Sequence, residues 1–278
     1  MKKILTYLLI ALLAMSMLAG CGKKEAKEPA NRLEKILADG VITMATSPDF
    51  APMEFIDDSK EGQDMYVGVD IEFAKYIAEN LGVELKIEAM DFSALQTAVS
   101  LGQVDMVLAG LAWKEERAEA MELSEFYNVI SEDNGQGILV KTTEVDKYQT
   151  AEDFSGKTIA VQNASLQLSL LESQLPDAKV EIVTNINDGV MMLIAGKVDG
   201  VGVAGTNGIT INENYPEVKL SGFLYEYESE GNVVGMPKGE TELCEKINEI
   251  ISKAAAEDLF TKWNNDARNL AAEIGWKN

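Results

Sequence analysis

The sequence predicts an α/β protein of two similar lobes, each built on a parallel sheet, behind a short processing segment. Three observations carry this prediction. Strand and helix patterns alternate in the same order along two successive stretches of chain. A Gly-x-Val-Asp segment recurs in both, at residues 102–105 and 196–199, an offset of 94 residues (196 − 102). The C-terminal stretch is helical and begins no third unit.

Length and composition limit the classes of protein to which the chain can belong. Its 278 residues suffice for one large or two ordinary domains, and 46% hydrophobic content is that of a folded protein. A formal net charge of −22 disfavours nucleic acid and anionic lipid headgroups. The absence of histidine excludes Ser-His-Asp and Cys-His catalysis and His-ligated metals. With only two cysteines, no metal and no cofactor are expected.

The first twenty residues have the features of a secretory signal peptide. Lys2 and Lys3 form a positive n-region, residues 4–18 are almost uninterruptedly apolar, and small residues precede Cys21. Residues 18–21, Leu-Ala-Gly-Cys, resemble the bacterial lipobox, which implies cleavage before Cys21 and lipid on that cysteine. An uncleaved transmembrane anchor is the alternative, because the apolar run approaches membrane-spanning length.

The segment behind the signal, residues 21–31, is short and polar and is expected to be a tether. After cleavage Cys244 is the one thiol besides the lipidated Cys21, so we expect it to be a buried, small apolar side chain. No second apolar run approaches membrane-spanning length. The folded body from Arg32 is therefore expected outside the cell membrane, held there by lipid.

Each half of the body contains the order strand–helix–strand–helix–strand. In the first half the expected elements are residues 41–45, 69–81, 85–89, a helix around 95–99, and 106–109. In the second half they are residues 158–161, 165–175, 180–183, 186–195 and 200–204. Glycines end the first helix at Gly82 and the second at Gly102. A single large sheet is the alternative to two lobes.

A strand at residues 233–236 and two amphipathic helices follow the second half. We expect them to pack back onto the first lobe, so that the chain crosses between lobes twice. Lobe 1 is then residues 32–138 plus 233–278 and lobe 2 is residues 139–232, with hinges near 139–142 and 229–233. Ligands of open α/β sheets bind beyond the carboxyl ends of the strands, so we expect a ligand in the cleft between the lobes.

Several local motifs accompany this organisation. They are TSPDFAPMEF at 46–55, GVDI at 68–71, DF at 91–92, GQVD at 102–105, AG at 109–110, ERAE at 116–119, LSEFY at 123–127, GKTIAV at 156–161 and KW at 262–263. Together they resemble the polar amino-acid family of ABC-transporter solute-binding proteins, which have the type II periplasmic-binding-protein fold. The resemblance covers residues 32–275. It implies a monomeric, lipid-tethered receptor that delivers an amino acid or related small carboxylate to a permease and ATPase complex.

The resemblance also implies the residues of the ligand site. Phe50 and Phe92 are implied as aromatic walls against the ligand. Arg117 is implied as a planar clamp on the ligand carboxylate, and Gly110 as a backbone N–H donor to it. Ser165 is implied as a hydroxyl at the positive end of a helix in the second lobe.

Four positions restrict the ligand. Ala112 stands where the family usually has a Ser or Thr hydroxyl, and Lys114 replaces a common Thr. Ala204 occupies the position where an Asp usually binds the ligand's α-ammonium group. Ser47 stands where members that bind cationic side chains carry an acid, which argues against arginine, lysine or ornithine as ligand.

Two acids could reach the ammonium instead of residue 204, namely Asp49 and Glu54, and the sequence does not rank them. The same acids are the available groups for the first alternative function, a secreted dehydratase-like enzyme on this scaffold. A sensory lipoprotein without a transport role is the second alternative. The expectation is a binding protein without catalytic residues.

Overall fold

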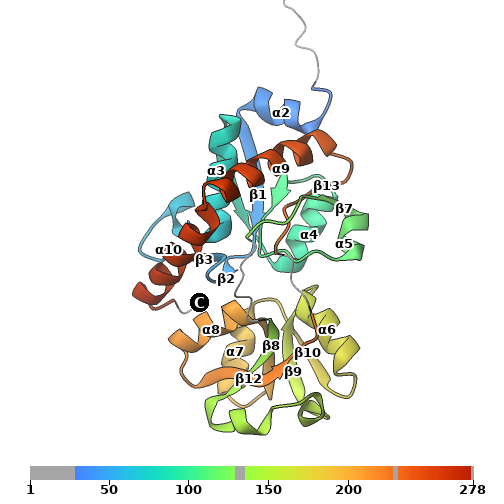
Figure 1. Ribbon diagram of the computed structural model, residues 1–278, viewed down its shortest axis with the longest axis vertical. Coiled ribbons are helices and arrows are strands. Elements are labelled where there is room, and N and C mark those ends of the chain that lie inside the picture. The colour runs from blue at the N-terminus through green and yellow to red at the C-terminus, as the bar shows by residue number, and fades with distance from the viewer. Residues whose placement is uncertain (1–28, 129–134, 228–230, 277–278) are drawn as a thin grey trace, which may run out of the picture. The chain divides into compact units, whose positions relative to one another are not determined.

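Two five-stranded sheets with helices on their faces organise the chain from Asn31 onward (Figure 1). The computed structural model describes residues 29–128, 135–227 and 231–276. The predicted signal peptide, Cys21 and most of the predicted tether lie outside these residues. Among the described residues, no helix has the length and apolar character needed to cross a bilayer.

The first sheet has the strand order β5-β1-β6-β13-β7. Its strands are β1 (Val41–Thr46), β5 (Glu84–Ala89), β6 (Met106–Val107), β7 (Met121–Leu123) and β13 (Gly235–Pro237). β1 runs parallel to both neighbours, with Met44 opposite Ile87 on one side and Met106 on the other. β13 is antiparallel to β6 and β7.

The second sheet repeats this plan in the order β10-β9-β11-β8-β12. Its strands are β8 (Gln136–Lys141), β9 (Thr158–Gln162), β10 (Lys179–Val183), β11 (Gly200–Ala204) and β12 (Val218–Leu224). β9 is parallel to β10 and β11, whereas β8 is antiparallel to β11 and β12.

The predicted fold of two α/β lobes is confirmed, and one antiparallel strand in each makes both sheets mixed rather than purely parallel. In each sheet four strands run in the same direction, and only the fourth in the strand order, β13 or β8, runs against its two neighbours. The fourth strands, β8 and β13, are the first that the chain forms after each crossing between the sheets. Parallel strands need a long crossover connection, usually a helix, and neither β8 nor β13 is reached through one. Their direction is therefore set by the crossing.

The start of β8 also differs from the boundary predicted between residues 138 and 139. Ile138 and Leu139 lie opposite Gly202 and Val201, inside the second sheet. A hinge at residues 139–142 would fall within this strand, because its buried apolar run continues without a break. The first crossing therefore precedes Gln136, and residues 129–134 of it, like 228–230 of the second, lie outside the described residues.

Four of the predicted helices connect the parallel strands of the two sheets. They are α3 (Val69–Leu81), α4 (Phe92–Ser100), α6 (Leu166–Gln174) and α7 (Ile186–Ile194). α3 begins after Gly68, where φ is 124° and a Cβ atom would lie 2.3 Å from the carbonyl oxygen of Met53. Only glycine can occupy that position, so the start of α3 is fixed by the close approach of two backbone segments. The sequence did not predict α2 (Arg32–Asp39), α5 (Glu115–Ala120) or α8 (Gly205–Asn214).

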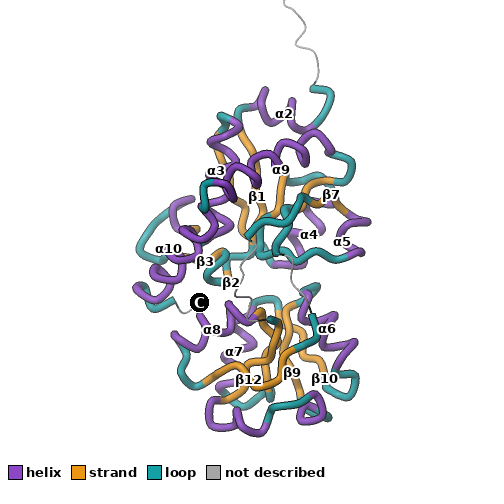
Figure 2. Tube along the Cα trace, in the orientation of Figure 1, coloured by secondary structure: helices purple, strands orange, loops and turns teal. Residues whose placement is uncertain are grey.

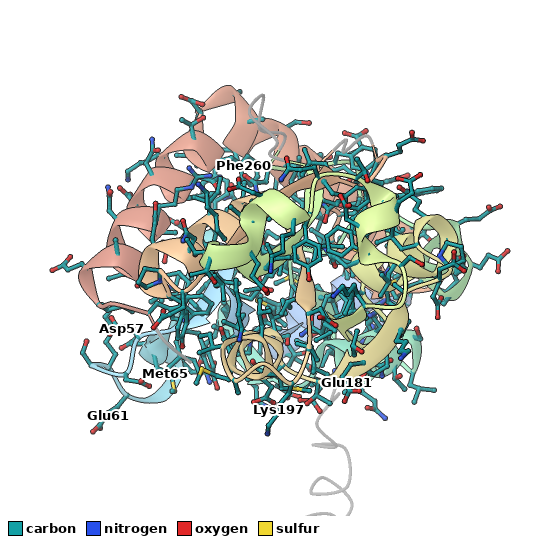
Figure 3. All side chains as sticks on the ribbon, turned by 90° about the horizontal axis from the view of Figure 1, so that it is seen from below. Asp57, Glu61, Met65, Glu181, Lys197 and Phe260 are labelled. Carbon is teal, nitrogen blue, oxygen red and sulfur yellow. The ribbon has the colours of Figure 1, made fainter. Side chains whose placement is uncertain are left out.

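A small antiparallel sheet is inserted between β1 and α3 (Figure 2). It consists of β2 (Asp49–Phe50), β3 (Glu54–Ile56) and β4 (Tyr66–Val67). Asp57, Glu61 and Met65 belong to the connection from β3 to β4, at the edge of the view in Figure 3. The insertion has no counterpart in the second half of the chain, which explains why the 94-residue offset does not extend back to β1.

The C-terminal helices α9 (Thr241–Ala256) and α10 (Leu259–Glu273) pack on the first lobe, as predicted. Phe260 and Trp263 of α10 place their ring centroids 5.1 and 6.2 Å from that of Phe73 in α3. Such ring pairs add about 0.5–1.5 kcal/mol beyond area burial. α10 also contacts α8 of the second lobe. Cys244 is buried and unpaired, as predicted.

Candidate functional site

A cavity of about 110 Å³ is lined by residues of both lobes. Phe50 follows β1, Gly110 follows β6, Gln162 ends β9 and Ala204 ends β11. The cavity therefore lies at the carboxyl ends of the parallel strands of both sheets. This is where open α/β sheets bind their ligands.

The structure brings seven of the eight predicted ligand-site residues together around this cavity. They are Phe50, Phe92, Gly110, Ala112, Arg117, Ser165 and Ala204. Ser47 does not line the cavity; its hydroxyl donates to Asp49 Oδ1 at 2.9 Å. The side chain of Ser47 is therefore placed to act through Asp49 rather than by direct contact.

Arg117 is buried at the cavity wall, with only 4% of its surface exposed. Its guanidinium donates to Gln96 Oε1 at 3.0 Å, to the Ala112 carbonyl at 2.6 Å and to the Ala164 carbonyl at 2.9 Å. Its central carbon lies 5.4 Å from the centre of the Phe92 ring. No carboxylate among the described residues forms an ion pair with it.

The hydrogen-bond acceptors of Arg117 are thus all neutral, and the charge of Glu116 acts on it without a direct ion pair. Burial lowers the pKa of Arg117 to about 10, so the side chain stays protonated at neutral pH. Three of its five N–H groups have protein acceptors, which leaves two for a ligand. A buried, unpaired guanidinium in a cavity is suited to bind a carboxylate.

The backbone N–H of Gly110 has a protein acceptor. It donates to Asp70 Oδ2 at 2.7 Å, and the Tyr127 hydroxyl donates to Asp70 Oδ1 at 2.8 Å. The N–H that the family resemblance implied as a donor to the ligand is therefore already engaged. Gly110 has a second role, because a Cβ there would lie 2.6 Å from Cε1 of Phe50. Glycine lets the Phe50 ring rest against the backbone.

Glu54 and Asp70 form a buried acid pair beside Gly110. Burial, followed by the negative charges of Asp70 and Asp49, raises the pKa of Glu54 well above its ordinary value. Burial also raises the pKa of Asp70 to about 6. Neither Glu54 oxygen has a donor among the described residues, which fits a protonated Glu54 that donates to Asp70. Burial beside two other carboxyl groups therefore favours the protonated form of Glu54.

Asp49 joins the two lobes. Its Oδ2 accepts from Gln162 Nε2 at 3.0 Å and from the Ile186 backbone N–H, in the first turn of α7, at 2.9 Å. Burial raises the pKa of Asp49 above its ordinary value, while these donors and Ser47 counteract the shift. A carboxylate at a helix N-terminus is favoured by the helix dipole.

Other hydrogen bonds join the lobes around the cavity. Asn207 donates to the Ala51 carbonyl at 2.9 Å, and Lys114 donates to Ser169 Oγ at 2.7 Å. Ser165 caps α6, where its Oγ accepts from the Leu168 N–H at 3.1 Å. The two lobes are closed on each other in this structure.

Sequence reasoning missed an amide cluster at the cavity. Asn264 of α10 donates to Asn128 Oδ1 at 2.6 Å, and Asn128 lies 3.5 Å from Asn232 Oδ1. All three line the cavity, and two of them flank the crossings between the sheets. An asparagine on an amphipathic helix gives no sequence signal that separates a cavity wall from an exposed face. No cluster of acidic or cysteine side chains among the described residues is arranged to hold a metal.

Two α/β lobes that enclose a cavity with a buried arginine define the type II periplasmic-binding-protein fold. The chain matches the bacterial extracellular solute-binding proteins, family 3, over residues 42–266. It therefore belongs to this family of solute-binding proteins.

Relatives of known name or structure agree with this assignment. The arginine-binding extracellular protein ArtP of Bacillus subtilis is 28% identical over 95% of this chain and 98% of its own. The substrate-binding protein AbpA of Streptococcus pneumoniae, bound to L-arginine, is 27% identical, with a TM-score of 0.80 over 86% of this chain and 99% of its own. An ancestral arginine-binding protein bound to glutamine is 29% identical, with a TM-score of 0.73 over 82% of this chain and 97% of its own.

Proposed function

We propose that this protein is the extracytoplasmic receptor of an ABC importer, which binds an amino acid or amino-acid-like small carboxylate between its lobes and delivers it to a permease. The observation that carries the proposal is Arg117, a buried cation that lines the cavity without a carboxylate partner among the described residues. Leaving such a charge without a counter-charge costs several kcal/mol, and a ligand carboxylate offsets that cost. The relatives bound to arginine or glutamine support the same class of ligand.

In this proposal each lobe supplies a different part of the site. Phe50 and Phe92 enclose the apolar body of the ligand, and Arg117 holds its carboxylate. Ser165 adds a hydroxyl at the start of α6. The small side chains at 112 and 204 leave room for the ligand.

A thermal-shift screen of the full chain in detergent tests the proposal. Amino acids, amines and small carboxylates are added one at a time, and the midpoint of unfolding is measured. A ligand at 100 times its dissociation constant should stabilise the folded state by about 2.7 kcal/mol. If no amino acid or small carboxylate stabilises the chain, the proposal is wrong.

The proposal includes lipid anchoring at Cys21 on the outer face of the cell membrane. Its basis is the lipobox-like segment, since Cys21 lies outside the described residues. Cys21→Ala should remove lipid from the chain and release any processed protein from the membrane. Membrane-bound Cys21→Ala protein without an uncleaved signal would contradict anchoring through this residue.

The proposal also includes closure of the two lobes about the ligand. Interlobe hydrogen bonds such as Asn207 to Ala51 are made only when the lobes meet. Small-angle X-ray scattering at saturating ligand should show a smaller radius of gyration than scattering without ligand. An unchanged radius in a chain that starts open would contradict closure.

A further inference from the structure

We propose that Asp49 supplies the counter-charge for the ligand's α-ammonium group, in place of the acid absent at residue 204. The inference rests on the proposed function, because it takes an amino-acid-like ligand with its carboxylate at Arg117. Desolvating an ammonium without a counter-charge is strongly disfavoured, so an α-amino acid needs an ionised acid in this cavity. Ala204 offers none.

One of the two acids at the cavity is better placed than the other to be ionised. Among the described residues, the carboxyl groups that line it are those of Asp49 and Glu54. Both Glu54 oxygens are buried without a hydrogen-bond donor among the described residues and lie near the carboxyl groups of Asp70 and Asp49, which disfavours the charged form of Glu54. Asp49 instead accepts hydrogen bonds from Ser47, Gln162 and the Ile186 N–H, and these donors favour its ionised form.

Asp49 lies at the same edge of the second sheet as residue 204. Its Oδ2 accepts from Gln162, the last residue of β9. β9 lies beside β11, with Ala160 opposite Val201, and Ala204 is the last residue of β11. Neighbouring strands are about 4.8 Å apart. Asp49 thus places a carboxylate at the edge of the strand next to residue 204.

The two carboxylate oxygens of Asp49 are unequally engaged by the rest of the protein. An ionised carboxylate offers about four lone-pair sites. Two hydrogen bonds, from Gln162 and the Ile186 N–H, reach Oδ2, and one, from Ser47, reaches Oδ1. Oδ1 therefore has fewer of these partners than Oδ2 and is the oxygen better placed to accept from an ammonium N–H, and the Ser47 hydroxyl fixes its orientation. Only 3% of Asp49 is exposed, so water competes weakly for this site.

Asp49 also holds the lobes together, so loss of affinity alone would not distinguish its two roles. Comparing two ligands that differ only in the ammonium group distinguishes the two roles. Isothermal titration of the full chain uses L-glutamine against glutarate monoamide, and L-arginine against δ-guanidinovalerate. The amino acid that binds wild type more tightly is carried forward with its desamino partner. Asp49→Asn should weaken binding of the amino acid about thirtyfold or more, and of the desamino partner less than about threefold.

Two further variants sharpen the test. Glu54→Gln makes the same isosteric change at the other acid of the cavity, and should alter the ratio of the two affinities less than about threefold. Adding Ala204→Asp to Asp49→Asn should restore the preference for the amino acid, because the charge returns on the neighbouring strand.

The outcomes separate this inference from the proposed function. Equal losses for both ligands in Asp49→Asn, or no loss for either, would overturn it. If Asp49→Asn does not fold, the two ligands are compared on the wild-type protein alone. A desamino partner that binds wild type as tightly as the amino acid overturns the inference. If wild type binds neither an amino acid nor a small carboxylate, the proposed function fails first.

Discussion

The carboxyl edges of the two sheets differ, although the sheets share one plan. After β1 the first lobe inserts the three-stranded sheet that carries Asp49 and Glu54, whereas only three residues separate β9 from α6. The first lobe thus brings ionisable and aromatic side chains to the cavity. The second lobe brings Tyr227 and otherwise uncharged polar groups, among them the Gln162 amide, the Ser165 cap and the Ile186 N–H. In the proposed function, this difference assigns ligand selection mainly to the first lobe.

The largest expected effect comes from the strongest charge of the first lobe. Arg117→Ala should weaken ligand binding by about 3–5 kcal/mol, or two to three and a half decades in dissociation constant, because it leaves the ligand carboxylate buried without a partner. Isothermal titration with the ligand found by the thermal-shift screen measures it. Ser165→Ala, on the second lobe, should lower the free energy of unfolding by about 1 kcal/mol because it removes the helix cap. It should weaken ligand binding less than Arg117→Ala does. If a folded Arg117→Ala protein binds the ligand with wild-type affinity, the first lobe does not dominate ligand binding through this residue.

The next effect concerns backbone strain at Gly110. Ala at Gly110 meets both a φ of 53° and the Phe50 ring, whereas Ala at Gly156, where φ is 71°, meets nothing within 4 Å. Both substitutions should lower the free energy of unfolding by about 1–2 kcal/mol through the left-handed backbone. Only Gly110→Ala should also weaken ligand binding, because it displaces Phe50. Urea unfolding and titration of both variants check this, and equal affinities would contradict the role given to Phe50.

The acid pair predicts how stability depends on pH. The pKa of Glu54 is raised in the folded state, so the folded protein holds a proton that the unfolded chain releases above about pH 4.5. The contribution of Glu54 is therefore fully present below that pH and is lost as pH rises toward its folded-state pKa. Glu54→Gln should make the free energy of unfolding depend less on pH over this range. Parallel slopes for wild type and variant, from urea unfolding at several pH values, would show that Glu54 does not hold this proton.

The smallest expected effect is at Ala204, the N-cap of α8, which forms no side-chain capping bond. Ala204→Asp should stabilise the fold by about 1 kcal/mol through capping. It should also strengthen binding of α-amino acids less than about tenfold, because Asp49 already supplies a charge. Thermal unfolding and titration measure both effects, with Ala204→Asn as the uncharged control. Tighter binding by Asn than by Asp would contradict a role for charge at this position.

Local signals predicted local structure well. The bounds of α3 follow from Gly68 and Gly82, because each glycine adopts a positive φ at one end of the helix. The strands β1, β9 and β11 follow from short apolar runs that are buried on both faces. The direction of β8 and β13 could not be read in this way, since it depends on where the chain re-enters a sheet.

The residues of the site likewise separate into those that local sequence predicts and those that depend on distant partners. Residues within recognisable motifs, such as Phe50, Phe92 and Arg117, were predicted and lie at the cavity. Whether an acid there is charged depends on a partner distant in sequence, as Asp70 is for Glu54. No local pattern reports such a partnership. The sequence therefore named both candidate acids but could not rank them.

The return of the chain to the first sheet through β13 governs the order in which the two lobes can be completed. β13 begins at Gly235 and is the strand that joins β6 to β7 in the first sheet. While the chain is being synthesised or exported from its N-terminus, the second sheet has all its strands once β12 is available. The first sheet must wait for β13. The N-terminal lobe is thus the last to be completed, so a chain truncated before Gly235 would expose an unfinished sheet with two unpaired edges.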